Sequence, residues 1–385
     1  MPTASNPYSD LALVLSGGGA RAAYQAGALR AVAELVPDLN FPIITGVSAG
    51  AINTVYLAAH EGSLTEAVHG LVDQWARLRS PDVYRVHPTV LVRDAVRMVL
   101  DAITGRRSGR PALRGLLDMS PLRGFLASCI DINGIERNLA LGRLRAAALS
   151  ATSYTNGCTV TFVDGARDLS MWSRAQRYAT REPLTFEHVL ASAAIPIVFP
   201  AVRLGDGYYG DGSVRQAAPL APSIHLGARR LLAIGMRAER PTGLAVTDIE
   251  YPSSAEVLGL LMHSIFLDSL DTDAERLERI NRTLALFPPD AASKPDMRRV
   301  DLLVLRPSRN LGAMAGDYRA DLPPVLNTVV RALGGRRRRA ADFLSYLMFT
   351  PPFTHDLMEL GYLDTLRHRE TIEAFLHGAP TPSVE

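Results

Sequence analysis

The strongest constraint on the fold is a short apolar segment that runs into a cluster of glycines and then into a helix-like segment, twice within the first 60 residues. The first unit comprises Leu11–Leu15, Ser16-Gly17-Gly18-Gly19 and residues 20–36. The second comprises residues 41–45, Gly46-Val47-Ser48-Ala49-Gly50 and residues 51–60. Uniformly apolar strands joined by helices are typical of a parallel sheet covered on both faces. The sequence therefore predicts an α/β fold with both glycine turns at the same sheet edge.

Composition excludes several classes of protein. Hydrophobic residues make up 47% of the 385 residues and charged residues 21%, which excludes a disordered chain. The net charge of +2 excludes a protein whose overall field drives binding to nucleic acid. No apolar run reaches the roughly 18 residues of a spanning helix. The first ten residues also lack the pattern of a secretory signal. We expect a cytoplasmic protein.

The motifs fall within residues 8–236, which we expect to form the catalytic region. An arginine-rich, helical insertion is predicted at about residues 81–147. Its apolar stripe at residues 92–103 indicates an amphipathic helix, either packed on the core or part of a mobile or membrane-facing cover of the site formed by residues 87–119. Residues 237–385 are predicted to be mostly helical and to pack on the same domain.

Ser48 is the candidate nucleophile. It lies in a Gly-x-Ser-x-Gly pattern with an apolar strand before it and a helix after it, the context that gives this pattern its meaning. Gly17, Gly18 and Gly19 begin 31 residues earlier and end another predicted strand. Their amides suit a developing oxyanion, and Arg21 either adds positive charge there or holds the loop. The competing interpretation is a dinucleotide-binding turn, but the second strand ends in a serine turn rather than an acidic residue.

The base is harder to identify, because none of the nine histidines lies in a convincing catalytic loop. The run Gly205-Asp206-Gly207-Tyr208-Tyr209-Gly210-Asp211-Gly212 is predicted to be a dense turn region. It offers two aspartates next to glycines, Asp211 and Asp206. An Asp-Gly pair is often only a turn. The residues alone leave the choice open.

Four motifs in order resemble the patatin-like phospholipase family. They are Ser16-Gly-Gly-Gly-Ala-Arg21, Gly46-Val-Ser-Ala-Gly50, Ala191-Ser-Ala-Ala-Ile-Pro196 and Asp211-Gly-Ser213 followed by Ala218-Pro219. The resemblance covers residues 11 to 236 and implies a three-layer α/β/α fold with a mainly parallel central sheet and inserted helices. It also implies a Ser-Asp dyad of Ser48 and Asp211, with Asp206 left as a turn residue.

The resemblance further implies an oxyanion site formed by Gly17, Gly18, Gly19 and Arg21. Two residues depart from the family pattern. Ala22 stands where glycine is frequent, and Ser213 adds a hydroxyl that we expect to bond Asp211 and lower its basicity.

The resemblance implies a lipid acyl hydrolase of phospholipase A or esterase type that works through an acyl-enzyme, with no metal or organic cofactor. Its expected partners are a phospholipid or other acyl lipid and, peripherally, a membrane surface, and we expect no nucleic acid. The alternative is a weak or inactive patatin-fold scaffold that binds lipid. The arginine cluster at residues 336–339 would suit anionic head groups, although a solvated helix face is the more ordinary interpretation. A second cluster, at residues 105–110, indicates a linker or an exposed loop.

Overall fold

The computed structural model describes residues 7–86, 115–238, 268–287, 298–321 and 343–378, with separate positions between 257 and 265. The predicted amphipathic helix at residues 92–103 lies outside the described residues. The arginine clusters at 105–110 and 336–339 also lie outside them.

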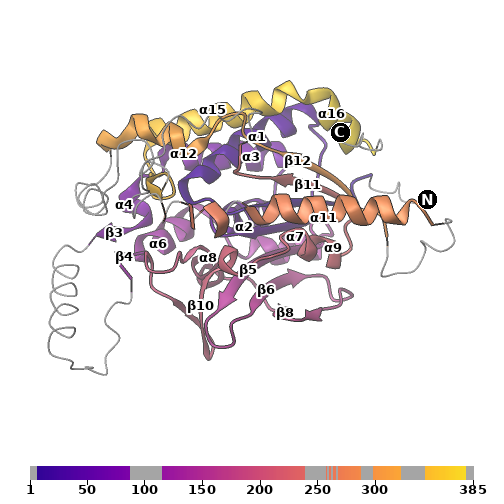
Figure 1. The fold of residues 1–385 in the computed structure, drawn as a ribbon, viewed down its shortest axis with the longest axis horizontal. Coiled ribbons are helices and arrows are strands. Elements are labelled where there is room, and N and C mark those ends of the chain that lie inside the picture. Colours follow the sequence, from indigo (N-terminus) through magenta and orange to yellow (C-terminus); the bar gives the residue numbers. More distant parts are fainter. Residues whose placement is uncertain are drawn as a thin grey trace.

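A mixed sheet, mainly parallel, forms the centre of the molecule (Figure 1). Its parallel part has the order β12-β11-β1-β2-β5, and β6 and β10 both pair antiparallel with β5. The strands are β1 (Leu11–Leu15), β2 (Ile43–Val47), β5 (Ala146–Ser153), β6 (Thr159–Gly165), β7 (Ser173–Arg174), β8 (Arg177–Arg181), β9 (Val202–Leu204), β10 (Gly207–Asp211), β11 (Arg230–Ile234) and β12 (Asp301–Leu305). A separate small sheet pairs β3 (Arg85–Val86) with β4 (Leu117–Asp118).

Helices lie on both sides of the sheet, as in a three-layer α/β/α fold (Figure 1). The longer helices are α1 (Ala23–Leu35), α2 (Ala49–Ala59), α3 (Leu64–Arg77), α6 (Ser120–Cys129), α7 (Gly134–Ala140), α8 (Phe186–Ala193), α11 (Asp268–Leu284), α15 (Pro351–Arg367) and α16 (Arg369–Leu376). Short pieces are η1 (Gly19–Ala22), α4 (Ser80–Val83), η2 (Gly212–Val214), α9 (Ala221–His225), α12 (Leu311–Met314) and η3 (Ala315–Asp321). The predicted fold class is confirmed.

The two faces of β1 belong to two different cores, because successive side chains of a strand point to opposite faces. Leu11, Leu13 and Leu15 pack in the larger cluster, which includes side chains of α1, α2, α3 and α15. Ala12 and Val14 pack in a smaller cluster with side chains of α11. Both faces of this strand are therefore buried, which explains why it carries no polar residue.

One local prediction was wrong. Residues 205–212 were expected to be a dense turn region, but only the start of this run turns, and Gly207–Asp211 forms strand β10. Tyr208 and Tyr209 favour a strand, and β10 gains ladder partners on two sides, β9 and β5. This pairing outweighs the preference of the glycines for turns, and it places Asp211 at the end of a strand rather than in a loop.

Candidate active site

Ser48 stands at the sharp turn between β2 and α2. Its backbone has φ 55° and ψ −130°, which costs on the order of 1–3 kcal/mol and persists only where the surroundings enforce it. Close packing enforces it here, because a Cβ on Gly50 would lie 2.3 Å from the carbonyl oxygen of Leu15. The amide of Ser48 donates to Ser192 Oγ at 2.9 Å, and that hydroxyl donates to the Ser150 carbonyl oxygen at 2.6 Å. The serine turn is thus fixed from two sides.

Asp211 is fully buried and faces Ser48. Its Oδ2 accepts a hydrogen bond from Ser48 Oγ at 2.6 Å. Its Oδ1 accepts from the amide of Ser213 at 2.9 Å, and its backbone carbonyl accepts from Thr152 Oγ1 at 2.8 Å. The carboxylate is therefore held in one orientation, with one oxygen directed at the serine hydroxyl.

Burial changes the acidity of this carboxyl group. Desolvation raises the pKa of Asp211 to about 7, and the hydrogen bonds from Ser48 and Ser213 oppose that rise. A base with a pKa near neutrality can both accept a hydroxyl proton and return it. The environment of Asp211 is therefore suited to proton transfer with Ser48.

Asp206, the other aspartate that the sequence offers, is exposed and lies in the turn between β9 and β10. It precedes Asp211 by five positions, which corresponds to about 16 Å along an extended strand. The structure brings Asp211 to Ser48 and leaves Asp206 at the far end of β10.

The glycine loop, residues 17–19, leaves the end of β1 beside the serine turn. A Cβ on Gly17 would lie 2.8 Å from Ser48 Cβ and 3.5 Å from Ser48 Oγ. Within the part of the chain that the structure describes, the amides of Gly17, Gly18 and Gly19 donate no hydrogen bond. Free amides next to a hydroxyl are the donors that a developing oxyanion requires.

Residues 343–349, which we call the C-terminal clamp, hold the other end of the glycine loop. Gly19 has φ +57°, and a Cβ there would lie 2.1 Å from the Tyr346 carbonyl oxygen, which accepts the amide of Ala20 at 3.0 Å. Arg21 is buried, donates from Nε to Ser345 Oγ at 2.7 Å and lies 4.1 Å above the ring of Tyr346. Of the two tasks that the sequence left open for Arg21, these contacts favour holding the loop.

The two departures from the family pattern leave the pair of Ser48 and Asp211 intact. Ala22 is buried at the start of α1. Ser213 bonds Asp211 through its backbone amide, whereas its buried hydroxyl has no hydrogen-bond partner among the described residues. The hydroxyl thus lies outside hydrogen-bonding geometry with Asp211, but the Ser213 side chain still lowers the pKa of that carboxyl group, in the expected direction.

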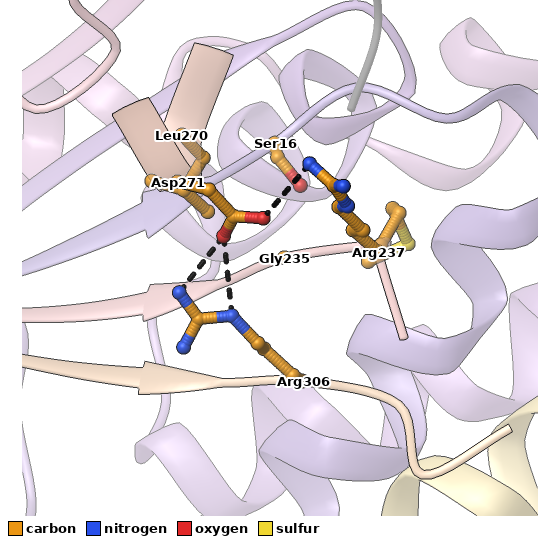
Figure 2. A pocket seen from close by; sticks show the side chains of 7 residues that line it. Ser16, Gly235, Arg237, Leu270, Asp271 and Arg306 are labelled. Atoms are coloured by element: carbon orange, nitrogen blue, oxygen red, sulfur yellow. Dashed lines mark hydrogen bonds and ion pairs between the residues drawn. The ribbon is translucent and has the colours of Figure 1, made fainter. Parts of the chain in front are cut away.

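A small hollow lies near the start of the glycine loop, at the carboxyl ends of β11 and β12. It is lined by Ser16, Gly235, Met236, Arg237, Leu270, Asp271 and Arg306. Figure 2 shows Asp271 between the two arginines: Arg306 Nη2 lies 2.8 Å and Arg237 Nη1 3.5 Å from its carboxylate. Arg237 also pairs with Asp268 at 2.8 Å. These charges balance, and the cluster attaches the start of α11 to the sheet edge.

The described residues contain no evident metal site. No group of three or more His, Cys, Asp or Glu side chains there is arranged to hold a metal ion. None of the helices in the described segments is long and apolar enough to span a membrane.

Three solved structures are similar to the chain at low identity. VipD from Legionella pneumophila is 12% identical with a TM-score of 0.34, and the match covers 94% of this chain and 67% of that one. Human GIVD cytosolic phospholipase A2 is 15% identical with a TM-score of 0.44, with coverage of 96% and 59%. ExoU in the ExoU-SpcU complex of Pseudomonas aeruginosa is 16% identical with a TM-score of 0.27, with coverage of 87% and 68%.

The family assignment rests on the sequence rather than on these structures. No curated protein matches the chain by sequence. The model of the family described as patatin-like phospholipase matches residues 13–224, which is more than half of the chain. The matched stretch includes the glycine loop, Ser48 and Asp211. The chain therefore belongs to the patatin-like phospholipase family.

Proposed function

We propose that the protein is a lipid acyl hydrolase of phospholipase A or esterase type, which cleaves fatty acyl esters through an acyl-enzyme on Ser48. The family supports lipid acyl hydrolysis in general. The observation that carries the finer proposal is the 2.6 Å hydrogen bond from Ser48 Oγ to the buried Asp211 Oδ2. A serine hydroxyl needs such a base to become a nucleophile.

In the first half of the proposed reaction, Ser48 Oγ attacks the acyl carbonyl carbon while its proton passes to Asp211 Oδ2. The carbonyl oxygen becomes an oxyanion, and the free amides of the glycine loop stabilise it. When the tetrahedral intermediate collapses, the bond to the leaving alcohol breaks, and Asp211 returns the proton to that alcohol. Ser48 is then acylated, and Asp211 is again ionised.

In the second half, Asp211 accepts a proton from water as the water oxygen attacks the acyl carbon. The second tetrahedral intermediate releases the fatty acid, and Ser48 Oγ takes the proton back from Asp211. One carboxyl group thus serves as base and acid in turn, a task for which a pKa of about 7 is suitable.

Nucleophile and base variants test the proposal. Ser48→Ala should lower hydrolysis of a 4-nitrophenyl acyl ester and of phospholipid vesicles by about 10⁴-fold or more. Asp211→Asn should lower it by about 10²–10⁴-fold. Asp206→Asn is the matched control, an aspartate in the same hairpin that is exposed, and it should retain activity. Full activity in Ser48→Ala would contradict the mechanism. A loss of activity confined to Asp206→Asn would identify Asp206, rather than Asp211, as the base.

Covalent labelling separates this proposal from the alternative of a lipid-binding scaffold without turnover. A fluorophosphonate reacts only with an activated serine, so the parent protein should be labelled and Ser48→Ala should not. An unlabelled parent protein would favour the scaffold. Peripheral contact with a membrane is part of the proposal, and sedimentation with anionic vesicles at low and high salt tests it.

A further inference from the structure

Ser16, the residue before the glycine loop, has all of its polar groups in hydrogen bonds. Its amide and its Oγ both donate to the Ile234 carbonyl oxygen, at 3.4 Å and 2.8 Å. Its own carbonyl oxygen accepts from Gln25 Nε2 at 2.8 Å. Because the C=O of Ser16 and the N–H of Gly17 belong to one planar trans peptide, they point in opposite directions. Holding the Ser16 carbonyl therefore also sets the direction of the Gly17 amide.

The side chain that holds Ser16 is itself held by two further buried residues. Gln25 Oε1 accepts from Asn53 Nδ2 at 2.8 Å, and Asn53 Oδ1 accepts from Trp75 Nε1 at 2.8 Å. All three side chains are buried. Together with the Ser16 carbonyl they form a chain of hydrogen bonds, which we call the amide relay.

Chemistry fixes the direction of the relay. The indole N–H of Trp75 can only donate, so Asn53 must present its oxygen there and its NH₂ group to Gln25. Gln25 must then accept with Oε1 and donate with Nε2, and the Ser16 carbonyl can only accept. Neither amide can be flipped without placing two acceptors or two donors against each other.

The relay also joins the two turns of the candidate site. Gln25 lies on α1, which follows the glycine loop, and Asn53 lies on α2, which begins directly after Ser48. The bond between Asn53 and Gln25 therefore links the helix behind the serine to the helix behind the oxyanion donors. Asn53 Nδ2 also approaches the Ala22 carbonyl oxygen at 3.3 Å.

We propose that Gln25 is a positioning residue for oxyanion stabilisation, and that the amide relay orients the Gly17 amide toward the reaction at Ser48. The inference rests on the proposed acyl transfer. Its physical basis is that an oxyanion donor acts only if it is oriented before the reaction, so that no reorganisation is needed in the transition state. Gln25 contacts no reacting atom and acts through Ser16.

Gln25→Met tests the proposal, because it keeps the length of the side chain and removes the donor. We expect kcat on a 4-nitrophenyl acyl ester to fall by about 10–100-fold while KM changes by less than about twofold, since the lost interaction belongs to the transition state. Affinity for an acyl trifluoromethyl ketone, which forms a tetrahedral adduct, should fall by a similar factor. Trp75→Phe should also reduce kcat, but by a smaller factor than Gln25→Met.

Thr54→Val is the matched control. Thr54 is the neighbour of Asn53 on α2 and equally buried, and its hydroxyl has no hydrogen-bond partner among the described residues. Its kcat and its affinity for the ketone should match those of the parent. Unchanged kcat and ketone affinity in folded Gln25→Met would overturn the proposal, even if its Tm fell, because the relay would then be only structural.

Gln25→Glu provides a second readout if the methionine variant does not fold. A protonated carboxyl can still donate to the Ser16 carbonyl, whereas the ionised form cannot. The ratio of its kcat to that of the parent should therefore fall as pH rises through the pKa of the introduced, buried carboxyl group, and a ratio independent of pH would contradict the proposal. If a fluorophosphonate did not label the parent protein, the proposed function itself would be refuted instead.

Discussion

The burial of Asp211 links the chemistry of the site to pH. Burial raises the pKa of this carboxyl group from its ordinary value of 3.8 to about 7. Because the folded state binds the proton more tightly than the unfolded state, the contribution of this group to stability is full below about pH 4 and is lost as pH rises through about 7. The ionised form that the proposed reaction needs is thus the form that destabilises the fold.

Activity should depend on pH in the direction set by this pKa. Below pH 7 Asp211 is mostly protonated and cannot accept the Ser48 proton, so kcat/KM should rise about tenfold per pH unit and level off above about pH 7 to 8. A pH profile on a soluble acyl ester measures this. A midpoint near pH 4 would show that the pKa of Asp211 is not raised by its burial.

Ser213 gives a second test, because only its backbone contacts Asp211 by a hydrogen bond. Ser213→Ala keeps the amide and removes a buried hydroxyl without a partner. Because the Ser213 side chain lowers the pKa of Asp211, we expect the midpoint of the pH profile to move to higher pH. Because an unsatisfied buried hydroxyl is removed, we also expect a gain of about 1 kcal/mol in the free energy of unfolding. An unchanged midpoint would show that the hydroxyl does not tune Asp211.

The sequence predicted the site residues better than it predicted what holds them. Ser48 lies in a recognisable pattern, and the structure places Asp211 and the glycine loop beside it, although their roles stay predictions. Gln25 and Asn53 were missed, and Ser192 was part of a motif but had no role assigned, because a hydrogen bond between distant segments leaves no local pattern. The available signal was weak: single amide side chains, Gln25 and Asn53, among mostly apolar neighbours in their helices.

Among the helices, α1 and α15 pack with unusually close backbones. A Cβ on Gly361 of α15 would lie 2.2 Å from the Tyr24 carbonyl oxygen of α1, and a Cβ on Gly27 of α1 would lie 1.8 Å from the Met358 carbonyl oxygen. Each helix therefore meets the other through a glycine. This contact fixes how α15 lies on α1, the helix that carries Gln25.

The same substitution should have opposite effects in two helices. Gly361→Ala places a methyl group against backbone atoms and should lower the free energy of unfolding by about 1–3 kcal/mol. Gly124→Ala, in α6, meets no atom within 4 Å and should raise it by about 0.5–1 kcal/mol. Urea denaturation measures both. Equal effects in the two variants would show that the close approach of α1 and α15 does not matter.

Local patterns predicted the elements that carry the glycine loop and Ser48, namely β1, α1, β2 and α2. Strand β10 was missed because its stability comes from two ladder partners rather than from its glycine-rich sequence. The packing of α15 on α1 was also beyond a local pattern. It depends on single glycines separated by more than 300 positions.

At the scale of the whole molecule, described segments that are far apart in the sequence pack against one another. Strand β12 extends the same sheet as β1, α15 covers α1, and the C-terminal clamp holds Arg21. We propose on these contacts that residues 237–385 are part of one folding unit with residues 8–236. A family resemblance limited to residues 11–236 would not have indicated this dependence.

Truncation tests this dependence. A chain cut after Asp321 loses the C-terminal clamp, α15 and α16, so the buried face of α1 becomes exposed. We expect no soluble chain that unfolds cooperatively, as measured by circular dichroism, and no fluorophosphonate labelling. A chain cut after Gly378 retains α16 and serves as the control. A soluble truncated chain with cooperative unfolding would show that the N-terminal region folds alone.

The clamp on Arg21 has a consequence for timing during synthesis. Arg21 and its partner Ser345 are separated by 324 positions, so at about 5–20 residues per second the ribosome makes Ser345 about 16–65 seconds after Arg21. Until then the C-terminal clamp cannot hold the glycine loop. A nascent chain that already contains both Ser48 and Asp211 therefore has an unfinished site, and lipids near the ribosome meet the complete site only after synthesis has passed Ser345.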